Sequence, residues 1–309
     1  MNIIDAHSHL WLRQDTTWDG KVIRTKDENA SRSMFLGNEV QMLPPFMIDG
    51  RNTAEVFLSN MDYAQVSAAV VTQEFIDGIQ NDYLEEVHRL YPDRFFVCGM
   101  CDYFHTGFAA QARTLIDRGF KAIKIPAHRL LLSDRRIMMT SPEMMQMFHL
   151  MENEGIIFSV DLADGDMQVA EMKEIIAECP QLKIAIGHFG MPTTDRWQEQ
   201  IKLARHENVF IESGGITWLF NSEFYPFHGA IRAIKEAADL VGIEKLMWGS
   251  DYPRTITAIT YKMSYDFVLK DPENLLSEAD KRAFLGENAE RLYGFYDVPL
   301  LPYIKNMSE

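Results

Sequence analysis

Two histidines near the start of the chain have a spacing that suits metal binding or carbonyl polarisation. A short apolar segment, residues 2–6, leads into His7 and His9. In a β-strand, residues i and i+2 point to the same face, so both imidazoles can project into one space at the carboxyl end of this strand. Such imidazole pairs hold a divalent ion or polarise a carbonyl group. Two histidines on a solvated loop would give the same pattern, so the assignment depends on what lies beside them in the fold.

Side chains of similar chemistry end or follow apolar segments farther along the chain. Acids, bases and metal ligands of this kind are His128, Arg129, Asp161, His188, Glu212, Asp251 and Arg254. Each has a structural alternative. A histidine beside glycine can be a hydrogen-bonded core residue, and an aspartate before Tyr-Pro can belong to a turn. A strand aspartate can position another residue, and a histidine or arginine can lie on an exposed loop.

Strand-like and helix-like segments alternate along the chain in a way that would bring these side chains together. Apolar runs predict strands at 2–6, 66–71, 94–100, 120–125, 156–162, 182–187, 208–212 and 245–249. Helical periodicity, capping residues and Gly or Pro stops predict helices near 54–61, 82–91, 107–118, 142–155, 169–178, 195–205, 226–241, 256–269 and 277–293.

Strands that alternate with helices indicate βαβ units and a parallel sheet. Eight such units in one chain of 309 residues predict a closed (β/α)8 TIM barrel that forms a single domain over 1–309. The active site of such a barrel lies at the carboxyl ends of its strands. All the polar residues singled out above fall at that end.

The segment 11–50 interrupts this alternation. It contains Trp11, Trp18 and Pro44-Pro45, and neither a helix nor a strand period persists in it. A long loop inside a compact domain is usually a lid or a binding loop. We therefore expect 11–50 to be an irregular insertion near the site.

Composition narrows the class of protein. The net charge of −15 argues against nucleic acid and anionic membrane surfaces as partners, and an anionic substrate would need local cations. The chain shows neither a secretory signal nor an apolar run near 18 residues. The three cysteines predict a reducing compartment, the cytoplasm. A Met-rich stretch at 137–151 is typical of core packing or of an oligomer interface, so a homodimer is one expectation.

Four motifs resemble one enzyme family. Ile4-Asp5-Ala6-His7-Ser8-His9, the Gly-His-Phe-Gly of 187–190, the Trp-Gly-Ser-Asp-Tyr-Pro of 248–253 and the Gly-Glu-Asn-Ala-Glu-Arg-Leu-Tyr of 286–293 occur in this order. Together they resemble the amidohydrolase-related branch of the amidohydrolase superfamily. The resemblance covers nearly the whole chain. It implies a (β/α)8 barrel that catalyses hydrolysis or decarboxylation.

The resemblance leaves a bound metal as an open alternative. In metal-using members, two histidines of strand 1 and one of strand 5 hold a divalent ion together with the aspartate of strand 8. Here Asp161 stands where many relatives have the strand-5 histidine. This feature, the segment 120–124 and the spacing from Asp161 to His188 are similar to the sugar-lactone and pyrone-lactone hydrolases. Some of these enzymes are thought to work without a tightly held ion.

These observations predict a hydrolase that opens a lactone of a sugar acid or a related carboxylate. Asp251 would take a proton from the attacking water. His7, His9 and His188 would stabilise the oxygen that gains charge, or would hold an ion with Asp251, zinc first and manganese next. Substrate-binding candidates are Arg254, His128, Arg129, Asp161, Tyr252 and Trp218.

Three other functions stay open at this point. The first is metal-dependent decarboxylation of an aromatic or muconate-like acid, which a need for the ion would distinguish. The second is hydrolysis of an amide. The third is a ligand-binding barrel without activity, against which the joint presence of His7, His9 and Asp251 argues. In each case we expect the partner to be a small molecule.

Overall fold

The strands of the barrel follow one another in the predicted order. The computed structural model describes residues 1–305 and 307. Its barrel strands are β1 (Ile4–His9), β6 (Ala68–Thr72), β7 (Phe95–Val97), β8 (Gly99–Met100), β9 (Ala122–Ile125), β10 (Ile157–Val160), β11 (Ile184–Ile186), β12 (Val209–Glu212) and β13 (Leu246–Met247). All pairings among them are parallel. The (β/α)8 fold class is thereby confirmed.

The hydrogen-bonded ladder does not run continuously around the barrel, which corrects the expectation of full closure. It divides into a sheet β1-β6-β7 and a sheet β13-β12-β11-β10-β9-β8. The strand predicted over 94–100 is interrupted at Cys98, whose N–H still donates to Val71 O at 2.9 Å. At the other junction, Ala6 N donates to Trp248 O at 2.9 Å. His9 N also donates to Tyr252 O at 2.8 Å, so backbone hydrogen bonds outside the two ladders connect the neighbouring edges.

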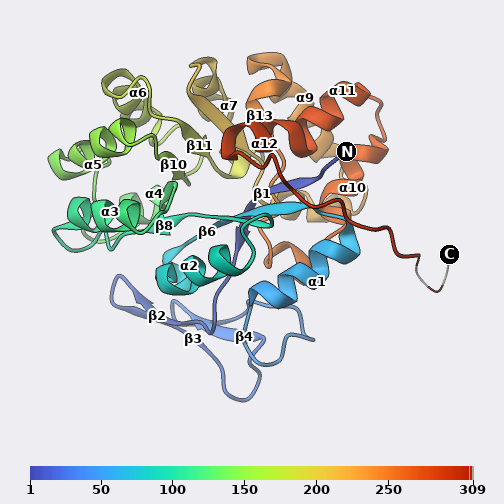
Figure 1. Ribbon diagram of the computed structural model, residues 1–309, viewed down its shortest axis with the longest axis horizontal. Helices are drawn as coiled ribbons and strands as arrows, with labels where there is room; N and C mark the ends of the chain where they lie inside the picture. Colours follow the sequence, from blue (N-terminus) through green and yellow to red (C-terminus); the bar gives the residue numbers. More distant parts are fainter. Residues whose placement is uncertain (306, 308–309) are drawn as a thin grey trace.

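Helices surround these strands (Figure 1). They are α1 (Ala54–Ala64), α2 (Asn81–Leu90), α3 (Phe108–Asp117), α5 (Pro142–Asn153), α6 (Val169–Glu178), α7 (Gln198–Ile201), α9 (His228–Val241), α10 (Met263–Lys270), α11 (Glu278–Arg282) and α12 (Asn288–Tyr293). Two short helices, α4 (Ala127–Leu132) and α8 (Ile216–Leu219), follow β9 and β12 where loops were expected. The helices predicted at 195–205 and 256–269 are each shorter and combined with a separate 3₁₀ turn.

The C-terminal motif packs directly beneath the first and last strands. The helix predicted over 277–293 contains a π-helical turn, 283–287, between α11 and α12. Phe284 O in this turn accepts a hydrogen bond from Trp248 N at 2.8 Å. A Cβ on Gly286 would lie 2.1 Å from Asn2 O, so only glycine allows this close approach. The motif thus helps to fix β1, which carries His7 and His9, and β13, which precedes Asp251.

The segment 11–50 is not an irregular loop. It folds into a four-stranded antiparallel sheet of order β2-β3-β4-β5, which we call the inserted sheet. Its strands are β2 (Asp15–Trp18), β3 (Lys21–Thr25), β4 (Arg32–Phe35) and β5 (Asn38–Gln41). Figure 1 shows this sheet at one side of the barrel, near α1 and α2. Two-residue turns at 19–20 and 36–37 have positive φ at both positions, the geometry that suits tight hairpins.

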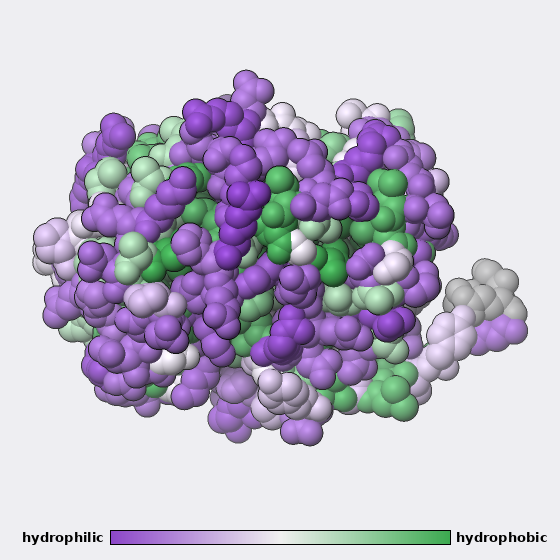
Figure 2. Space-filling model, turned by 90° about the horizontal axis from the view of Figure 1, so that it is seen from above, coloured by the Kyte–Doolittle hydropathy of each residue, from purple (hydrophilic) through white to green (hydrophobic). Residues whose placement is uncertain are grey.

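Most methionines of the Met-rich stretch 137–151 lie in the core. Met144, Met147 and Met151 of α5 are fully buried, so these side chains fill the space between helix and barrel. The homodimer stays a prediction. Hydrophilic side chains cover most of the face shown in Figure 2. Among residues 1–305 and 307, no helix has the length and apolarity needed to cross a membrane.

Candidate active site

The two histidines of β1 and the aspartate after β13 meet at one end of the barrel. Nε2 of His7 lies 3.0 Å from Nε2 of His9. Oδ1 of Asp251 lies 3.3 Å from Nε2 of His9 and 3.7 Å from Nε2 of His7. The backbone N–H of Asp251 also donates to His7 O at 2.9 Å, which fixes the two segments to each other. The structure therefore brings these three predicted residues together, and they are all buried.

Each imidazole is oriented by a partner on its other ring nitrogen. Nδ1 of His7 lies 2.5 Å from Oε1 of Glu212, and Nδ1 of His9 lies 2.7 Å from Oδ2 of Asp77. Nδ1 of His188 lies 2.8 Å from Gly214 O. Such contacts fix the tautomer and the ring orientation, and so direct the three Nε2 atoms into the site.

Asp161 and Lys124 form a buried ion pair beside the histidines. Lys124 Nζ lies 2.5 Å from Asp161 Oδ1, and both side chains are almost fully buried. The other carboxylate oxygen, Oδ2, lies 3.6 Å from Nε2 of His188. A Cβ on Gly187 would lie 2.2 Å from Asp161 Oδ1. Glycine before His188 therefore leaves the space that this carboxylate occupies.

The electrostatics of the site favour an ionised Asp251. Burial alone would raise the pKa of Asp251, but the His9 hydrogen bond and the nearby His188 and His7 rings outweigh burial and hold this pKa below its usual range. Burial opposes protonation of His9 as well, yet Asp77 and Asp251 raise its pKa to about 10. The pKa of His7 is lowered, chiefly because the ring is buried.

His188 and Asp161 influence each other in the same way. Burial lowers the pKa of His188, but the Asp161 carboxylate outweighs this effect and raises it to about 9. Burial would raise the pKa of Asp161, whereas Lys124 and His188 hold it well below its usual range. At neutral pH the site therefore combines carboxylates with imidazolium donors.

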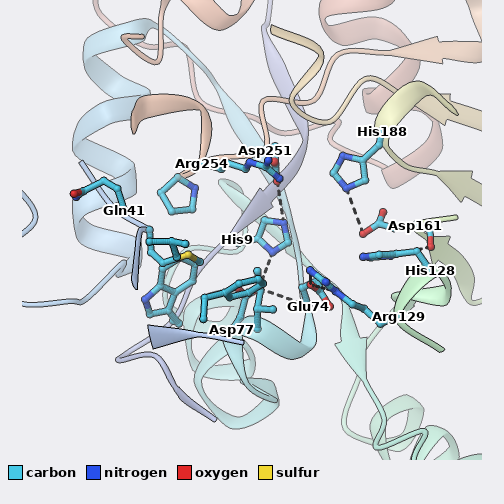
Figure 3. Close-up of a pocket in the computed structure, with 16 residues that line it drawn as sticks. His9, Gln41, Glu74, Asp77, His128, Arg129, Asp161, His188, Asp251 and Arg254 are labelled. Atoms are coloured by element: carbon cyan, nitrogen blue, oxygen red, sulfur yellow. Dashed lines mark hydrogen bonds and ion pairs between the residues drawn. The ribbon is translucent and has the colours of Figure 1, made fainter. Parts of the chain in front are cut away.

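A cavity of about 390 Å³ opens above these groups. Figure 3 shows His9 near its centre, with His188, Asp161 and His128 on one side and Gln41 on the other. The lining residues are His9, Trp11, Phe35, Val40, Gln41, Met42, Glu74, Ile76, Asp77, His128, Arg129, Asp161, His188, Asp251, Pro253 and Arg254. The inserted sheet and the residue after it thus contribute one wall.

Two predicted arginines lie at the cavity in different surroundings. Arg129, on α4, is bound to Glu74 with an Nη2–Oε2 distance of 2.8 Å. Arg254 is exposed, and its guanidinium lies 3.9 Å from the centre of the Trp218 ring. Nε1 of Trp218 donates to Asp251 Oδ2 at 2.9 Å. Trp218 therefore supports both Asp251 and Arg254.

Tyr252, which was predicted to bind the substrate, does not line the cavity. Tyr252 is fully buried and stacks on Phe57 with ring centres 4.0 Å apart. A cis peptide bond joins Tyr252 to Pro253, and Pro253 lines the cavity instead. The aromatic residues that do line it are Trp11 and Phe35.

Sequence reasoning missed several partners of the site. Asp77 and Glu74 lie in the 3₁₀ turn after β6 and at its start, and Lys124 was noted only through the family resemblance. Glu212 was singled out as following a strand, but no contact with His7 was foreseen. The position of Lys124 and Glu212 at the carboxyl ends of β9 and β12 was the available signal.

The residues present fit a divalent ion at one position. Ligand atoms of His7, His9 and Asp251 all lie within 4.8 Å of one another. Two imidazoles with fixed tautomers and one carboxylate form a donor set that suits zinc or manganese. A second group within the same distance, His7, Asp161 and His188, fits less well because Asp161 is already paired with Lys124.

Comparisons with known proteins agree with this architecture. Three solved structures of similar fold cover nearly the whole chain. A zinc-bound amidohydrolase from Burkholderia multivorans is 18% identical and covers 97% of this chain and 100% of its own, with a TM-score of 0.72. A probable 2-pyrone-4,6-dicarboxylic acid hydrolase from Acinetobacter baumannii, with citric acid bound, is 19% identical and covers 95% and 100%, with a TM-score of 0.67. A 2,6-dihydroxybenzoate decarboxylase from Rhizobium is 14% identical and covers 95% and 99%, with a TM-score of 0.65.

Structural similarity at this level of sequence identity establishes only the fold. Membership of a family follows from the match to a sequence-family model. No curated protein sequence matches this chain significantly. The family model described as amidohydrolase matches residues 4–295, which is nearly the whole chain. The protein therefore belongs to the amidohydrolase family of hydrolases with a (β/α)8 barrel.

Proposed function

We propose that the protein hydrolyses a lactone that carries a carboxylate. The observation that supports this proposal most strongly is the position of Asp251. Its ionised carboxylate lines the cavity and is held by His9 on one oxygen and by Trp218 on the other. A fixed carboxylate facing a small cavity can act as the general base for an attacking water.

The reaction proceeds by addition and elimination at the ester carbonyl. Asp251 accepts one proton from water as the oxygen of that water bonds to the carbonyl carbon. His188 donates its Nε2–H to the carbonyl oxygen as this oxygen becomes negative, since its Nδ1–H is donated to Gly214 O. The ring nitrogens of His9 already face Asp77 and Asp251, so the positive charge of His9 stabilises the carbonyl oxygen electrostatically. The ring C–O bond then breaks, and the departing alkoxide takes the proton from Asp251. The product is a hydroxy acid, and Asp251 returns to its starting state.

Stabilisation of the substrate carbonyl oxygen compensates for the weak basicity of Asp251. A carboxylate with a low pKa is ionised at neutral pH, but it is a weak base. Stabilisation of the carbonyl oxygen lowers the barrier that proton transfer alone would leave. The buried Lys124–Asp161 pair positions His188 for this contact, since Asp161 Oδ2 faces the Nε2 atom of that ring.

A bound divalent ion fits the same site. His7, His9 and Asp251 would hold it, zinc in the first place and manganese in the second. When bound, it would supply Lewis-acid polarisation of the carbonyl. His7 and His9 would then act as neutral ligands, with their Nδ1–H groups donated to Glu212 and Asp77.

Arg254 is the proposed partner of the substrate carboxylate. Its side chain lines the cavity and is exposed at its mouth, while stacking on Trp218 limits its freedom. Guanidinium groups bind carboxylates through two parallel hydrogen bonds. The A. baumannii relative with bound citric acid supports carboxylate binding in this fold. The small-molecule substrate and the three buried, unpaired thiols fit a cytoplasmic enzyme.

A metal-dependent decarboxylase is the second candidate. The specific observation in its favour is the His7, His9 and Asp251 group, which could hold an ion that binds substrate oxygens. Asp251 would then deliver a proton to the carbon that loses carbon dioxide.

Both candidate functions can be tested by measuring the metal content of the protein together with its turnover of substrates. The purified protein is assayed on a panel of carboxylated lactones and on hydroxybenzoates before and after treatment with a chelator. Lactone opening, with or without a stoichiometric ion, supports the proposal. Carbon dioxide release from the aromatic acids that stops after chelation, together with inert lactones, would replace it by decarboxylation.

A further inference from the structure

We infer that the substrate carries one carboxylate and one apolar group, and that the inserted sheet selects for the apolar group. This inference deepens the lactonase proposal and takes the reaction class from it. It depends on two independent features of the cavity, which are the pairing of its charged groups and the side chains that the inserted sheet contributes.

Among the arginine and lysine side chains at the cavity, Arg254 alone lacks a carboxylate partner in the described part of the chain. Arg129 is bound to Glu74, and Lys124 beneath the cavity is bound to Asp161. Within residues 1–305 and 307, Arg254 forms no ion pair, and its guanidinium contacts the face of Trp218. The cavity therefore has a ready site for one substrate carboxylate, at Arg254.

A second carboxylate would have to compete with Glu74 for Arg129. Two aromatic rings further restrict Arg129, since the centre of the Trp18 ring lies 5.3 Å and that of the Phe35 ring 5.9 Å from its guanidinium carbon. Both rings belong to the inserted sheet. The sheet thus helps to hold Arg129 against Glu74. If a dicarboxylate bound, either Glu74 or the second carboxylate of the substrate would be poorly paired.

The wall from the inserted sheet is mainly apolar. Phe35, Val40 and Met42 line it and are half-buried, and Trp11 extends the same wall. Gln41 is the polar side chain that this part contributes, and Figure 3 shows it across the cavity from Asp161 and His128. An apolar substituent would remove this surface from water, whereas the hydroxyl groups of a sugar would lose hydrogen bonds there.

Binding of unreactive ring carboxylates tests the inference without any reaction. Calorimetry would compare an alkyl-substituted cyclohexanecarboxylate, a cyclohexanedicarboxylate and a polyhydroxylated cyclohexanecarboxylate. We expect the alkyl monocarboxylate to bind at least about tenfold more tightly than the other two. Equal or tighter binding of the dicarboxylate or of the polyhydroxylated acid would overturn the inference.

Substitutions in the sheet locate the selection. Val40→Thr keeps the side-chain shape and places a hydroxyl in the apolar wall, so the preference for the alkyl group should fall about tenfold. Val22→Thr is the matched control, because Val22 is an exposed residue of the same sheet outside this cavity. Equal effects of the two substitutions would show that the wall does not select the substrate.

Glu74→Gln tests the charge argument. It removes the carboxylate partner of Arg129 while keeping a side-chain oxygen for the N–H of Phe75. Binding of the dicarboxylate should then improve about tenfold relative to the monocarboxylate. An unchanged ratio would refute the role of Glu74.

Turnover of the matching lactones separates this inference from the proposed reaction. If none is hydrolysed while the binding preferences hold, the lactonase proposal fails and the specificity assignment stands. If lactones are hydrolysed without preference for an apolar monocarboxylate, the reaction stands and the specificity assignment fails.

Discussion

The barrel end and the inserted sheet differ in how firmly their residues are held. All residues of β1 and β10 are buried, and the ring nitrogens and carboxylates at their ends have fixed partners. In β2 and β5, by contrast, most residues are exposed or half-buried, and ion pairs such as Arg24–Asp15 lie on the surface. Exposed ion pairs of this kind contribute little stability.

This difference suggests a division of labour within one cavity. Groups that move protons or stabilise charge need a fixed position, which paired residues on barrel strands provide. A wall that selects substrates needs mainly shape and apolarity, and a peripheral sheet can vary these without disturbing the barrel. Substitutions at the barrel end should therefore reduce the rate or the stability, and those near the mouth should alter binding.

The largest effect is expected for Asp251→Asn. The amide cannot accept a proton from water, so kcat on a carboxylated lactone should fall about a thousandfold. Thermal unfolding would verify that the fold is intact, and Asp93→Asn on the surface is the control. A rate near that of the unmodified protein would exclude Asp251 as the base.

Lys124→Met should reduce the stability most. It leaves the Asp161 carboxylate buried without its cation, which costs about 3–5 kcal/mol in the free energy of unfolding. Denaturant titration would measure this loss beside Lys235→Met, which breaks the exposed Lys235–Asp239 pair and should cost under about 1 kcal/mol. Similar losses for the two variants would contradict the contrast between buried and exposed pairs.

Glu212→Gln should lower activity while leaving substrate binding nearly unchanged. The neutral amide replaces a charged hydrogen bond to Nδ1 of His7 by a weaker one, and changes of this kind reduce activity or metal affinity about 10- to 100-fold. Steady-state kinetics would show the decrease in kcat. A variant in which only KM changes would argue against a positioning role for Glu212.

Arg254→Met should have a smaller effect, confined to binding. Loss of the charged hydrogen bonds to the substrate carboxylate should raise KM about tenfold with little change in kcat. Arg51→Met, at an exposed position outside the cavity, provides the comparison. If Arg254→Met and the unmodified protein discriminate to the same extent between charged and esterified substrates, the assignment of Arg254 is wrong.

The sequence contained enough information to place the catalytic end of the fold. Strand periodicity located β1 and β13, and the i, i+2 spacing correctly predicted that His7 and His9 point to one space. The contacts of Glu212 and Asp77 with these rings were not foreseen, because they join residues 205 and 68 positions apart. Such pairs depend on how distant strands come together in the fold and leave no local pattern.

The inserted sheet was missed for a different reason. Its strands have only 4–5 residues, and exposed residues dominate them, so no alternation of apolar and polar residues persists. The Asp19-Gly20 pair was a local hairpin signal, since both residues have positive φ in the turn between β2 and β3. Greater weight on this dipeptide would have predicted at least one hairpin in place of a loop.

The most direct test of the proposed reaction follows the oxygen of water. The protein is incubated with a carboxylated lactone that bears an alkyl group, in water enriched in oxygen-18, and the product is analysed by mass spectrometry. We predict a hydroxy acid that has gained one labelled oxygen in its new carboxylate and has kept the original one. A product that has lost carbon dioxide and contains no labelled oxygen would contradict the attack of water on the lactone carbonyl.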